Sequence, residues 1–141
     1  MDEKSFNSEL VRSLKFLGFW AYKIPDSPVS WTKGATRFTP IKPCDVIACG
    51  GQTGLLAIES KLLKKWCAFD PMKALRPSQV LNLKEIASKG HSAWLFLNVR
   101  AGRDNALIPF RWQDVEGFKG SIGKEALKRL PRVGRIKVGV S

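Results

Sequence analysis

The sequence has few of the residues that build disulfide scaffolds and histidine-based sites: three cysteines and one histidine among 141 residues. Cys44, Cys49 and Cys67 are too few, and odd in number, for a disulfide framework, so we expect a reducing setting inside the cell. Their spacing relative to His91 fits no compact zinc knuckle, which disfavours a zinc site. A single histidine also disfavours catalytic triads that depend on this residue.

Long hydrophobic runs are absent as well. No segment approaches the roughly 20 apolar residues that a membrane-spanning helix needs. The first residues are acidic and lack the basic and then apolar layout of a signal peptide, so we expect none. No predicted helix combines a basic face with bulky apolar anchors, which disfavours a protein of the membrane surface. We therefore expect a cytoplasmic protein without membrane partners, encoded by a cell or by a virus that acts in its host cell.

Acidic residues are scarce and unevenly placed. Twelve Asp and Glu face 24 Lys and Arg, which gives a net charge of +12 and favours a polyanionic partner, nucleic acid foremost. Between residues 10 and 84 the only acids are Asp26, Asp45, Glu59 and Asp70. Asp26 and Asp70 adjoin prolines and are typical of turns. Asp45 and Glu59 lie in apolar, strand-like contexts and need another explanation.

The length suits one domain spanning 1–141, with a core over about 5–110 and a helical, basic C-terminal extension over 111–141. Apolar periodicity predicts helix 5–17, strands 19–24, 45–49, 55–61, 92–100 and 106–110, helix 79–89 capped by Ser78, and short helices at 112–116 and after 121. Two long connections, 25–43 and 64–76, are basic. A hairpin followed by a crossover helix and a further strand predicts an α/β fold with a central mixed sheet flanked by helices.

The two carboxylates that lack a turn explanation meet in the predicted hairpin. An antiparallel hairpin around the turn 50–54 places Asp45 opposite Glu59, with Cβ atoms about 4.5–5.5 Å apart. Strand alternation puts Lys61 on the same face as Glu59 and turns Ser60 to the other face. Asp45, Glu59 and Lys61 should therefore converge at the open end of the hairpin, and a slip of one residue would destroy this cluster.

Two carboxylates beside an ammonium suit metal-dependent phosphodiester hydrolysis. Carboxylate oxygens are ligands for Mg²⁺, which activates a bound water and polarises a phosphate oxygen. The lysine then stabilises charge on the phosphate or helps to activate the water. The alternative is a surface Glu–Lys pair beside an Asp that starts a strand, which would stabilise the fold only weakly. Spacing alone leaves both interpretations open.

The pattern resembles a known family. Asp45, a hairpin and Glu59-Ser60-Lys61 resemble the core of the restriction-endonuclease-like PD-(D/E)XK nucleases. A longer ordered set over residues 5–100 is similar to Holliday junction resolvases of the archaeal and viral type. That set comprises a helix with an early Glu, Gly18-Phe19 entering the first strand, Lys23-Ile24-Pro25-Asp26-Ser27, the Asp-Val-Ile-Ala strand at 45–48, and Ser78-Gln79.

The resemblance implies a restriction-endonuclease-like fold and a homodimer that cuts a four-way DNA junction symmetrically with Mg²⁺, for which Mn²⁺ would substitute. It implies metal binding by Glu9, Asp45, Glu59 and the Ser60 carbonyl, catalysis by Lys61, and accessory positioning of phosphate or water by Ser27 and Gln79. Read without the resemblance, Glu9 is a helix-surface acid, Ser27 is a loop residue, and Gln79 is a capping or solvated amide.

Two positions depart from the family pattern. Cys44 stands between Pro43 and Asp45, where the family places the proline directly before the aspartate. Lys23 replaces the usual arginine, and lysine is a weaker bidentate ligand for phosphate. The second departure weakens the case for the segment around Pro25 more than the case for the hairpin cluster.

Basic residues in and beside the two long connections are candidate phosphate contacts that position DNA without reading bases. They are Lys23, Lys33, Arg37, Lys42, Lys64, Lys65, Lys73 and Arg76. The alternative is a solvated basic face. Trp31 and Trp66 lie in the same connections, where they would stack on exposed bases or pack against a dimer partner.

The sequence thus predicts a Mg²⁺-dependent, structure-selective DNA endonuclease, foremost a Holliday junction resolvase. Two alternatives remain open. One is a nicking, repair or restriction-type endonuclease of the same fold, although base-reading elements have little room in 141 residues. The other is a catalytically silent DNA-binding module, in which the hairpin carboxylates would be dispensable and binding would still weaken steeply with salt.

Overall fold

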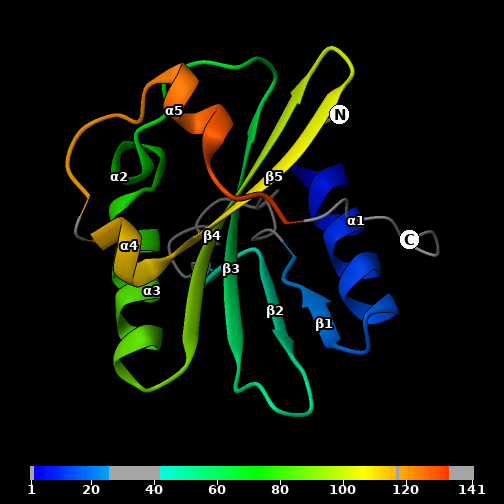
Figure 1. Ribbon diagram of the computed structural model, residues 1–141. Helices are drawn as coiled ribbons and strands as arrows, with labels where there is room; N and C mark the ends of the chain where they lie inside the picture. Colours follow the sequence, from blue (N-terminus) through cyan, green and yellow to red (C-terminus); the bar gives the residue numbers. More distant parts are fainter. Residues whose placement is uncertain (1, 26–41, 117, 134–141) are drawn as a thin grey trace, which may run out of the picture.

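The computed structural model describes residues 2–25, 42–116 and 118–133 (Figure 1). Most of the first basic connection therefore lies outside the described residues. Four residues singled out from the sequence fall there, and their predicted roles stay predictions: Ser27, Trp31, Lys33 and Arg37.

The first helix, α1, spans Glu3–Phe16 and begins two residues earlier than its apolar periodicity predicts. The reason is a cap in the acidic N-terminal segment. The Asp2 side chain accepts a hydrogen bond of 2.8 Å from the backbone N–H of Ser5, which satisfies one of the first-turn donors. Phe6 and Leu10 form the buried stripe of the helix. The earlier start adds two residues to the helix, Glu3 and Lys4.

A five-stranded sheet forms the centre of the molecule, in the order β1-β2-β3-β4-β5. All neighbouring strands pair antiparallel except β3 and β4, which are parallel, so the predicted mixed sheet is confirmed. The strands are β1 Trp20–Lys23, β2 Val46–Cys49, β3 Leu56–Leu63, β4 Ser92–Ala101 and β5 Asp104–Arg111.

The register of the β2–β3 hairpin is the one that the sequence predicts. Ile47 pairs with Ala57, and the flanking pairs keep the same register. One residue before β2, the Asp45 backbone N–H donates to the Ile58 carbonyl at 3.0 Å, which continues the ladder towards Glu59. Asp45 and Glu59 therefore stand at the same level of the hairpin, at its open end.

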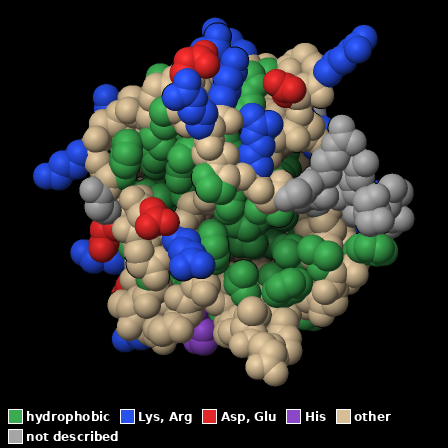
Figure 2. Space-filling model, in the orientation of Figure 1, with side chains coloured by type: hydrophobic (Ala, Val, Ile, Leu, Met, Phe, Trp, Pro, Cys, Tyr) green, Lys and Arg blue, Asp and Glu red, His purple; other side chains and the backbone are tan. Residues whose placement is uncertain are grey.

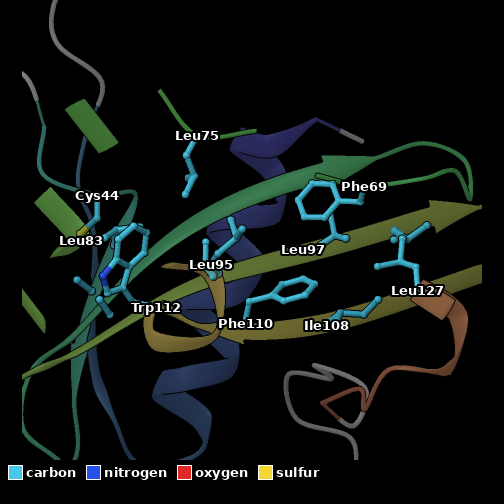
Figure 3. Packing of buried hydrophobic residues seen from close by; sticks show 14 of the residues in the cluster. Cys44, Phe69, Leu75, Leu83, Leu95, Leu97, Ile108, Phe110, Trp112 and Leu127 are labelled. Carbon is cyan, nitrogen blue, oxygen red and sulfur yellow. The ribbon is translucent and has the colours of Figure 1, made fainter. Parts of the chain in front are cut away.

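Helices cover both faces of the sheet (Figure 1). On one face α1 packs over a small apolar cluster that includes Val46 and Ile58. On the other face lies the larger core, which includes Leu83 of α3 and Leu95 and Leu97 of β4 (Figure 3). The helices that follow α1 are α2 Pro71–Ala74, α3 Pro77–Ser88, α4 Trp112–Glu116 and α5 Lys124–Arg129.

The start of α3 differs from the prediction. Arg76, and not Ser78, is the N-cap residue, because Pro77 occupies the first helical position, where its missing N–H costs nothing. The shift of two residues moves Gln79 from the first to the third position of the helix. There its side-chain Oε1 accepts a hydrogen bond of 2.9 Å from the backbone N–H of Arg76.

Two connections are also more ordered than predicted. The basic segment 64–76 contains α2, which Asp70 caps by accepting from the N–H groups of Met72 and Lys73. The β4–β5 turn is two residues long instead of five, because Gly102 adopts a φ of +60° that a tight hairpin requires.

Beyond residue 110, the described segments 111–116 and 118–133 pack on the same core. Trp112, Val115 and Leu127 are buried in the larger core, and Val133 forms a bridge with Leu107 of β5. Across the described ranges, none of the helices combines the length and apolar character needed to cross a membrane.

Candidate active site

An open, polar cavity of about 240 Å³ lies where the open end of the β2–β3 hairpin meets the first turns of α1 and α3. Its lining combines three acids with five cations, so positive charge predominates. The lining residues are Glu3, Lys4, Asn7, Lys23, Lys42, Asp45, Glu59, Lys61, Arg76 and Gln79. The fold therefore brings together Asp45, Glu59, Lys61 and Gln79, four of the residues predicted from the sequence.

Asp45 and Glu59 form a buried carboxyl pair. Their residues are 8% and 2% exposed, and their side chains are hydrogen-bonded to each other. Burial, together with the neighbouring Asp45 carboxylate, raises the pKa of Glu59 to about 9. Glu59 therefore keeps its proton at neutral pH, although the positive charges of Lys61 and Lys42 oppose the rise of its pKa.

Asp45 is the ionised member of this pair. Burial alone would raise the pKa of Asp45, but the hydrogen bonds that it accepts outweigh burial and hold the pKa below its usual value. Its Oδ2 accepts from the Ser60 N–H at 2.9 Å and lies 3.1 Å from the Ser60 hydroxyl oxygen, whose single proton is directed to Asn7. Its Oδ1 lies 2.9 Å from the Lys42 ammonium. The Ser60 N–H and the Lys42 ammonium thus stabilise the negative charge of Asp45.

Gln79 binds Glu59 directly. Its Nε2 donates to Glu59 Oε1 at 2.7 Å while its Oε1 accepts from the backbone of Arg76. The amide is therefore fixed at both ends. It caps the helix, as one of the alternatives from the sequence had it, and its contact with Glu59 was not predicted. The contact ties the start of α3 to the middle of β3 and orients the Glu59 carboxyl.

Strand alternation separates the three consecutive residues of β3 as predicted. Ser60 turns towards α1, where its buried hydroxyl donates to the side-chain oxygen of Asn7. Glu59 and Lys61 both line the cavity. The Lys61 ammonium therefore shares the cavity with the carboxyl pair, and its positive charge lowers the pKa of Glu59 against the effect of burial.

The structure does not bring Glu9 to this cavity. The Glu9 side chain forms an ion pair with Arg100 of β4 instead. Glu3, in the first turn of α1, lines the cavity, and its pKa is raised by burial and by the negative charge of Asp45. Helix geometry explains the difference. With 3.6 residues per turn, residues that are six positions apart point in directions about 120° apart around the helix axis, so Glu3 and Glu9 lie on different sides of α1.

Sequence reasoning missed Glu3 and Asn7. Glu3 lay outside the predicted helix, because the Asp2 cap was not recognised. Asn7 is polar yet stands between Phe6 and Leu10 on the apolar stripe of α1, and it is buried. A polar side chain at such a position requires a hydrogen-bonding partner inside the fold, so it was a usable signal.

The predicted DNA contacts divide into two groups. Lys23, Lys42 and Arg76 line the cavity, and Lys4, which the sequence did not single out, joins them. A second group is exposed in the β3–α3 connection, away from the cavity lining: Lys64, Lys65 and Lys73.

Trp66 packs within the protein itself. Its indole N–H donates to Asp104 at 3.0 Å, and the cations of Lys128 and Arg132 lie over its ring. The side chain thereby joins the β3–α3 connection to the tip of the β4–β5 hairpin and to the C-terminal helix.

The donors of the cavity suit a hard divalent cation better than a soft one. Among the described residues, no three His, Cys, Asp or Glu side chains gather as a metal cluster. Cys44 is a poor ligand, because burial raises the pKa of its thiol to about 12 and keeps it neutral. The Asp45–Glu59 pair offers only oxygen donors, and a divalent cation would balance the second charge that the pair cannot otherwise carry.

Comparisons with known proteins bear on the fold. No family model matches the chain, and no curated protein is significantly similar to it in sequence. Among solved structures, the chain is similar to Hjc of Archaeoglobus fulgidus, a Holliday junction resolvase from an archaeal hyperthermophile. The two share 24% sequence identity over 92% of this chain and 94% of that chain, with a TM-score of 0.60. The likeness shows that this chain has the α/β fold of that resolvase.

Proposed function

We propose that this chain is a metal-dependent, structure-selective DNA endonuclease that resolves four-way junctions by paired, symmetric phosphodiester hydrolysis. One observation carries the proposal: the buried Asp45–Glu59 carboxyl pair shares a cation-lined cavity with Lys61. That combination suits hydrolysis of a phosphate diester, and it stands on a fold that a Holliday junction resolvase also has.

Asp45 and Glu59 would hold the metal, with the Ser60 carbonyl as a further ligand. Glu3 replaces Glu9 in the proposed set, because it is the acid of α1 that lines the cavity. Bound Mg²⁺, or Mn²⁺ in its place, supplies a Lewis acid that lowers the pKa of water and withdraws charge from a phosphate. The proton of Glu59 must leave before both carboxylates can act as ligands.

The other side chains of the cavity would orient the Glu59 carboxyl and bind the phosphates of the DNA. Gln79 fixes Glu59 through its 2.7 Å hydrogen bond to Oε1, which orients the carboxyl group beside Asp45. Lys61 places a positive charge beside the pair, where it stabilises charge that develops on the phosphate. Lys23, Lys42 and Arg76 supply further positive charge for neighbouring phosphates, which fixes DNA by its backbone and not by its sequence.

Symmetric cutting implies two such cavities. A two-fold homodimer presents the same cavity twice, and a four-way junction is itself nearly two-fold, so each subunit meets one of two opposed strands. The proposal therefore includes a homodimer as the active species.

A cleavage assay tests the proposal. Wild-type protein, Glu59→Gln and the control Glu85→Gln, an exposed acid of α3, are incubated with a synthetic four-way junction and with linear duplexes of the same sequences. Each reaction is run with Mg²⁺ and with EDTA. We expect paired nicks in the junction alone for the wild type and the control, and none in EDTA or with Glu59→Gln.

The other outcomes separate the alternatives. Equal cutting of linear duplex would keep the nuclease and overturn junction selectivity. Single unpaired nicks would favour a nicking enzyme. Tight, salt-dependent binding without cutting in Mg²⁺ or Mn²⁺ would overturn the enzyme and leave a DNA-binding module.

A further inference from the structure

Strand β1 presents two exposed aromatic rings. Trp20 is 54% and Tyr22 is 50% exposed. Their rings are nearly parallel, with an interplanar angle of 14° and centroids 6.4 Å apart. Ala21 between them is buried, as the alternation of a strand requires. The sequence of β1 thus directs one small residue inwards and two flat rings outwards.

The rings lie on the sheet face opposite α1. Ile24 follows at the same two-residue spacing and packs against the larger core, which lies on that face. In the described part of the chain, β1 pairs with β2 alone and forms an edge of the sheet. Figure 2 shows hydrophobic side chains reaching the surface over the β1–β2 side of the molecule. Two large rings left this exposed at one edge are typical of a binding surface.

The ring pair adjoins the proposed active site. Tyr22 directly precedes Lys23, which lines the cavity and whose ammonium donates to the Lys4 carbonyl at 3.5 Å. Successive residues of a strand advance by about 3.3 Å, so the backbone of both ring residues lies within roughly 10 Å of Lys23 along β1. The Lys23 side chain turns to the α1 face, and the two rings turn to the other face, to which Glu59 and Lys61 of the cavity also belong. A DNA strand held by its phosphates at the cavity and passing the β1 edge on this face would bring neighbouring bases to the rings.

We propose that Trp20 and Tyr22 form a stacking platform for unpaired DNA bases beside the cavity. The inference rests on the proposed function, since it takes the cavity as the place where the DNA backbone is held. Aromatic rings stack on any base regardless of sequence, which suits an enzyme that recognises a branched shape. The net charge of +12 favours a nucleic acid over a second copy of this equally basic chain as the occupant of this edge.

Binding measured in EDTA tests the platform without cleavage. The affinities of the wild type, of the double variant Trp20→Ala with Tyr22→Ala, and of Trp20→Phe with Tyr22→Phe are compared for an oligothymidylate and for a blunt duplex. Leu17→Ala, at an apolar residue that is more exposed than either ring, is the control. We expect the alanine variant to lose about tenfold or more in oligothymidylate affinity and to keep its duplex affinity. The phenylalanine variant and the control should bind as the wild type does.

A second measurement uses the wild type alone. An oligonucleotide carrying 5-iodouracil is photo-crosslinked to the protein, and the platform predicts crosslinks in the peptide 16–23, which contains both rings. Crosslinks elsewhere only, or unchanged oligothymidylate binding by the alanine variant, would overturn the platform. A sedimentation shift to smaller species with unchanged DNA binding would make the rings a contact between copies and overturn it as well. If ring-dependent binding is found but the junction is never cut, the proposed function fails and the platform stands.

Discussion

At the scale of single residues, the chemistry of the cavity depends on a conflict between burial and charge. Asp45 and Glu59 are held in contact away from water, and the fold supplies enough hydrogen bonds to ionise only one of them. An apolar pair of the same size would pack at lower cost. The fold thus carries a destabilised carboxyl pair next to Lys61, which is the arrangement that a cation or a phosphate group could relieve.

The stability of the metal-free protein should therefore fall as the pH rises. Glu59 has a pKa of 4.5 when it is unperturbed and about 9 in the fold, so between these values the native state binds more protons than the unfolded state. The free energy of unfolding then decreases by an amount on the order of 2 kcal/mol between pH 5 and pH 7. Glu59→Gln mimics the protonated acid and should remove this dependence.

Urea unfolding in EDTA at pH 5 and pH 7 measures the effect. Glu59→Gln should match the wild type at pH 5 and exceed it at pH 7, while the exposed control Glu85→Gln should follow the wild type at both values. Parallel pH dependence of the wild type and Glu59→Gln would show that Glu59 is already ionised in the native protein.

The two acids of α1 give a second residue-scale prediction. Glu3 lines the cavity and Glu9 is engaged by Arg100, so Glu3→Gln should weaken Mn²⁺ binding several-fold whereas Glu9→Gln should leave it unchanged. The half-exposed ion pair of Glu9 contributes less than about 1 kcal/mol to stability, so its variant should fold normally. Calorimetric titration of Mn²⁺ into EDTA-stripped and dialysed protein decides between them, and the reverse order would restore Glu9 as the ligand.

At the scale of elements, the site depends on how helix starts meet the hairpin. The first turns of α1 and α3 reach the open end of β2–β3 from opposite faces of the sheet, and Gln79 fastens one of them to Glu59. Each helix start is set by a cap, Asp2 in α1 and Pro77 with Arg76 in α3. Capping chemistry therefore positions the side chains that α1 and α3 contribute to the cavity.

Removing the Gln79 amide should loosen this connection. Gln79→Ala leaves Glu59 Oε1 and the Arg76 N–H without partners, which should cost about 1–3 kcal/mol of stability and lower the cleavage rate more than the junction affinity. Gln79→Glu keeps the cap acceptor but places a third acid beside the pair, so it should not restore the rate. Single-turnover cleavage and junction binding separate the two effects. If both variants lost the same amount of junction affinity and kept the cleavage rate, the positioning role would be contradicted.

Local patterns in the sequence predicted the hairpin well and the helix starts poorly. The turn at 50–54 and the alternation of β2 and β3 set the register, because each depends only on neighbouring residues. The contact of Gln79 with Glu59 joins residues 20 apart, and the place of Asn7 against Ser60 joins residues 53 apart. Local periodicity does not encode contacts between residues so far apart in the sequence. The residues that line the cavity could therefore be identified only from the folded structure.

At the scale of the whole molecule, the excess of positive charge is large, and part of it is concentrated around one cavity. Five of the cations line one cavity with three acids, on a chain whose net charge is +12. Phosphate contacts release counterions from DNA, so the logarithm of the binding constant should fall linearly as the logarithm of salt concentration rises. The slope of that line counts the phosphates that the protein neutralises.

The cavity lysines should each contribute to that slope. Lys23→Gln should reduce the slope for junction binding by about 1, while Lys84→Gln, an exposed lysine of α3 outside the cavity lining, should leave it unchanged. Fluorescence anisotropy at several salt concentrations in EDTA gives both slopes. Equal reductions in the two variants would mean that DNA is bound by diffuse charge instead of by the cavity.

The most direct test of the central claim is the product formed from a supercoiled plasmid that extrudes one cruciform. A dimer that uses two Asp45–Glu59 cavities on opposed strands should convert this plasmid to the linear form in Mg²⁺, without free nicked circles accumulating first. A plasmid without the cruciform should stay supercoiled, and so should both plasmids in EDTA. Tight binding of the cruciform with no strand cut in Mg²⁺ or Mn²⁺ would contradict the account, because the carboxyl pair would then hold no catalytic metal.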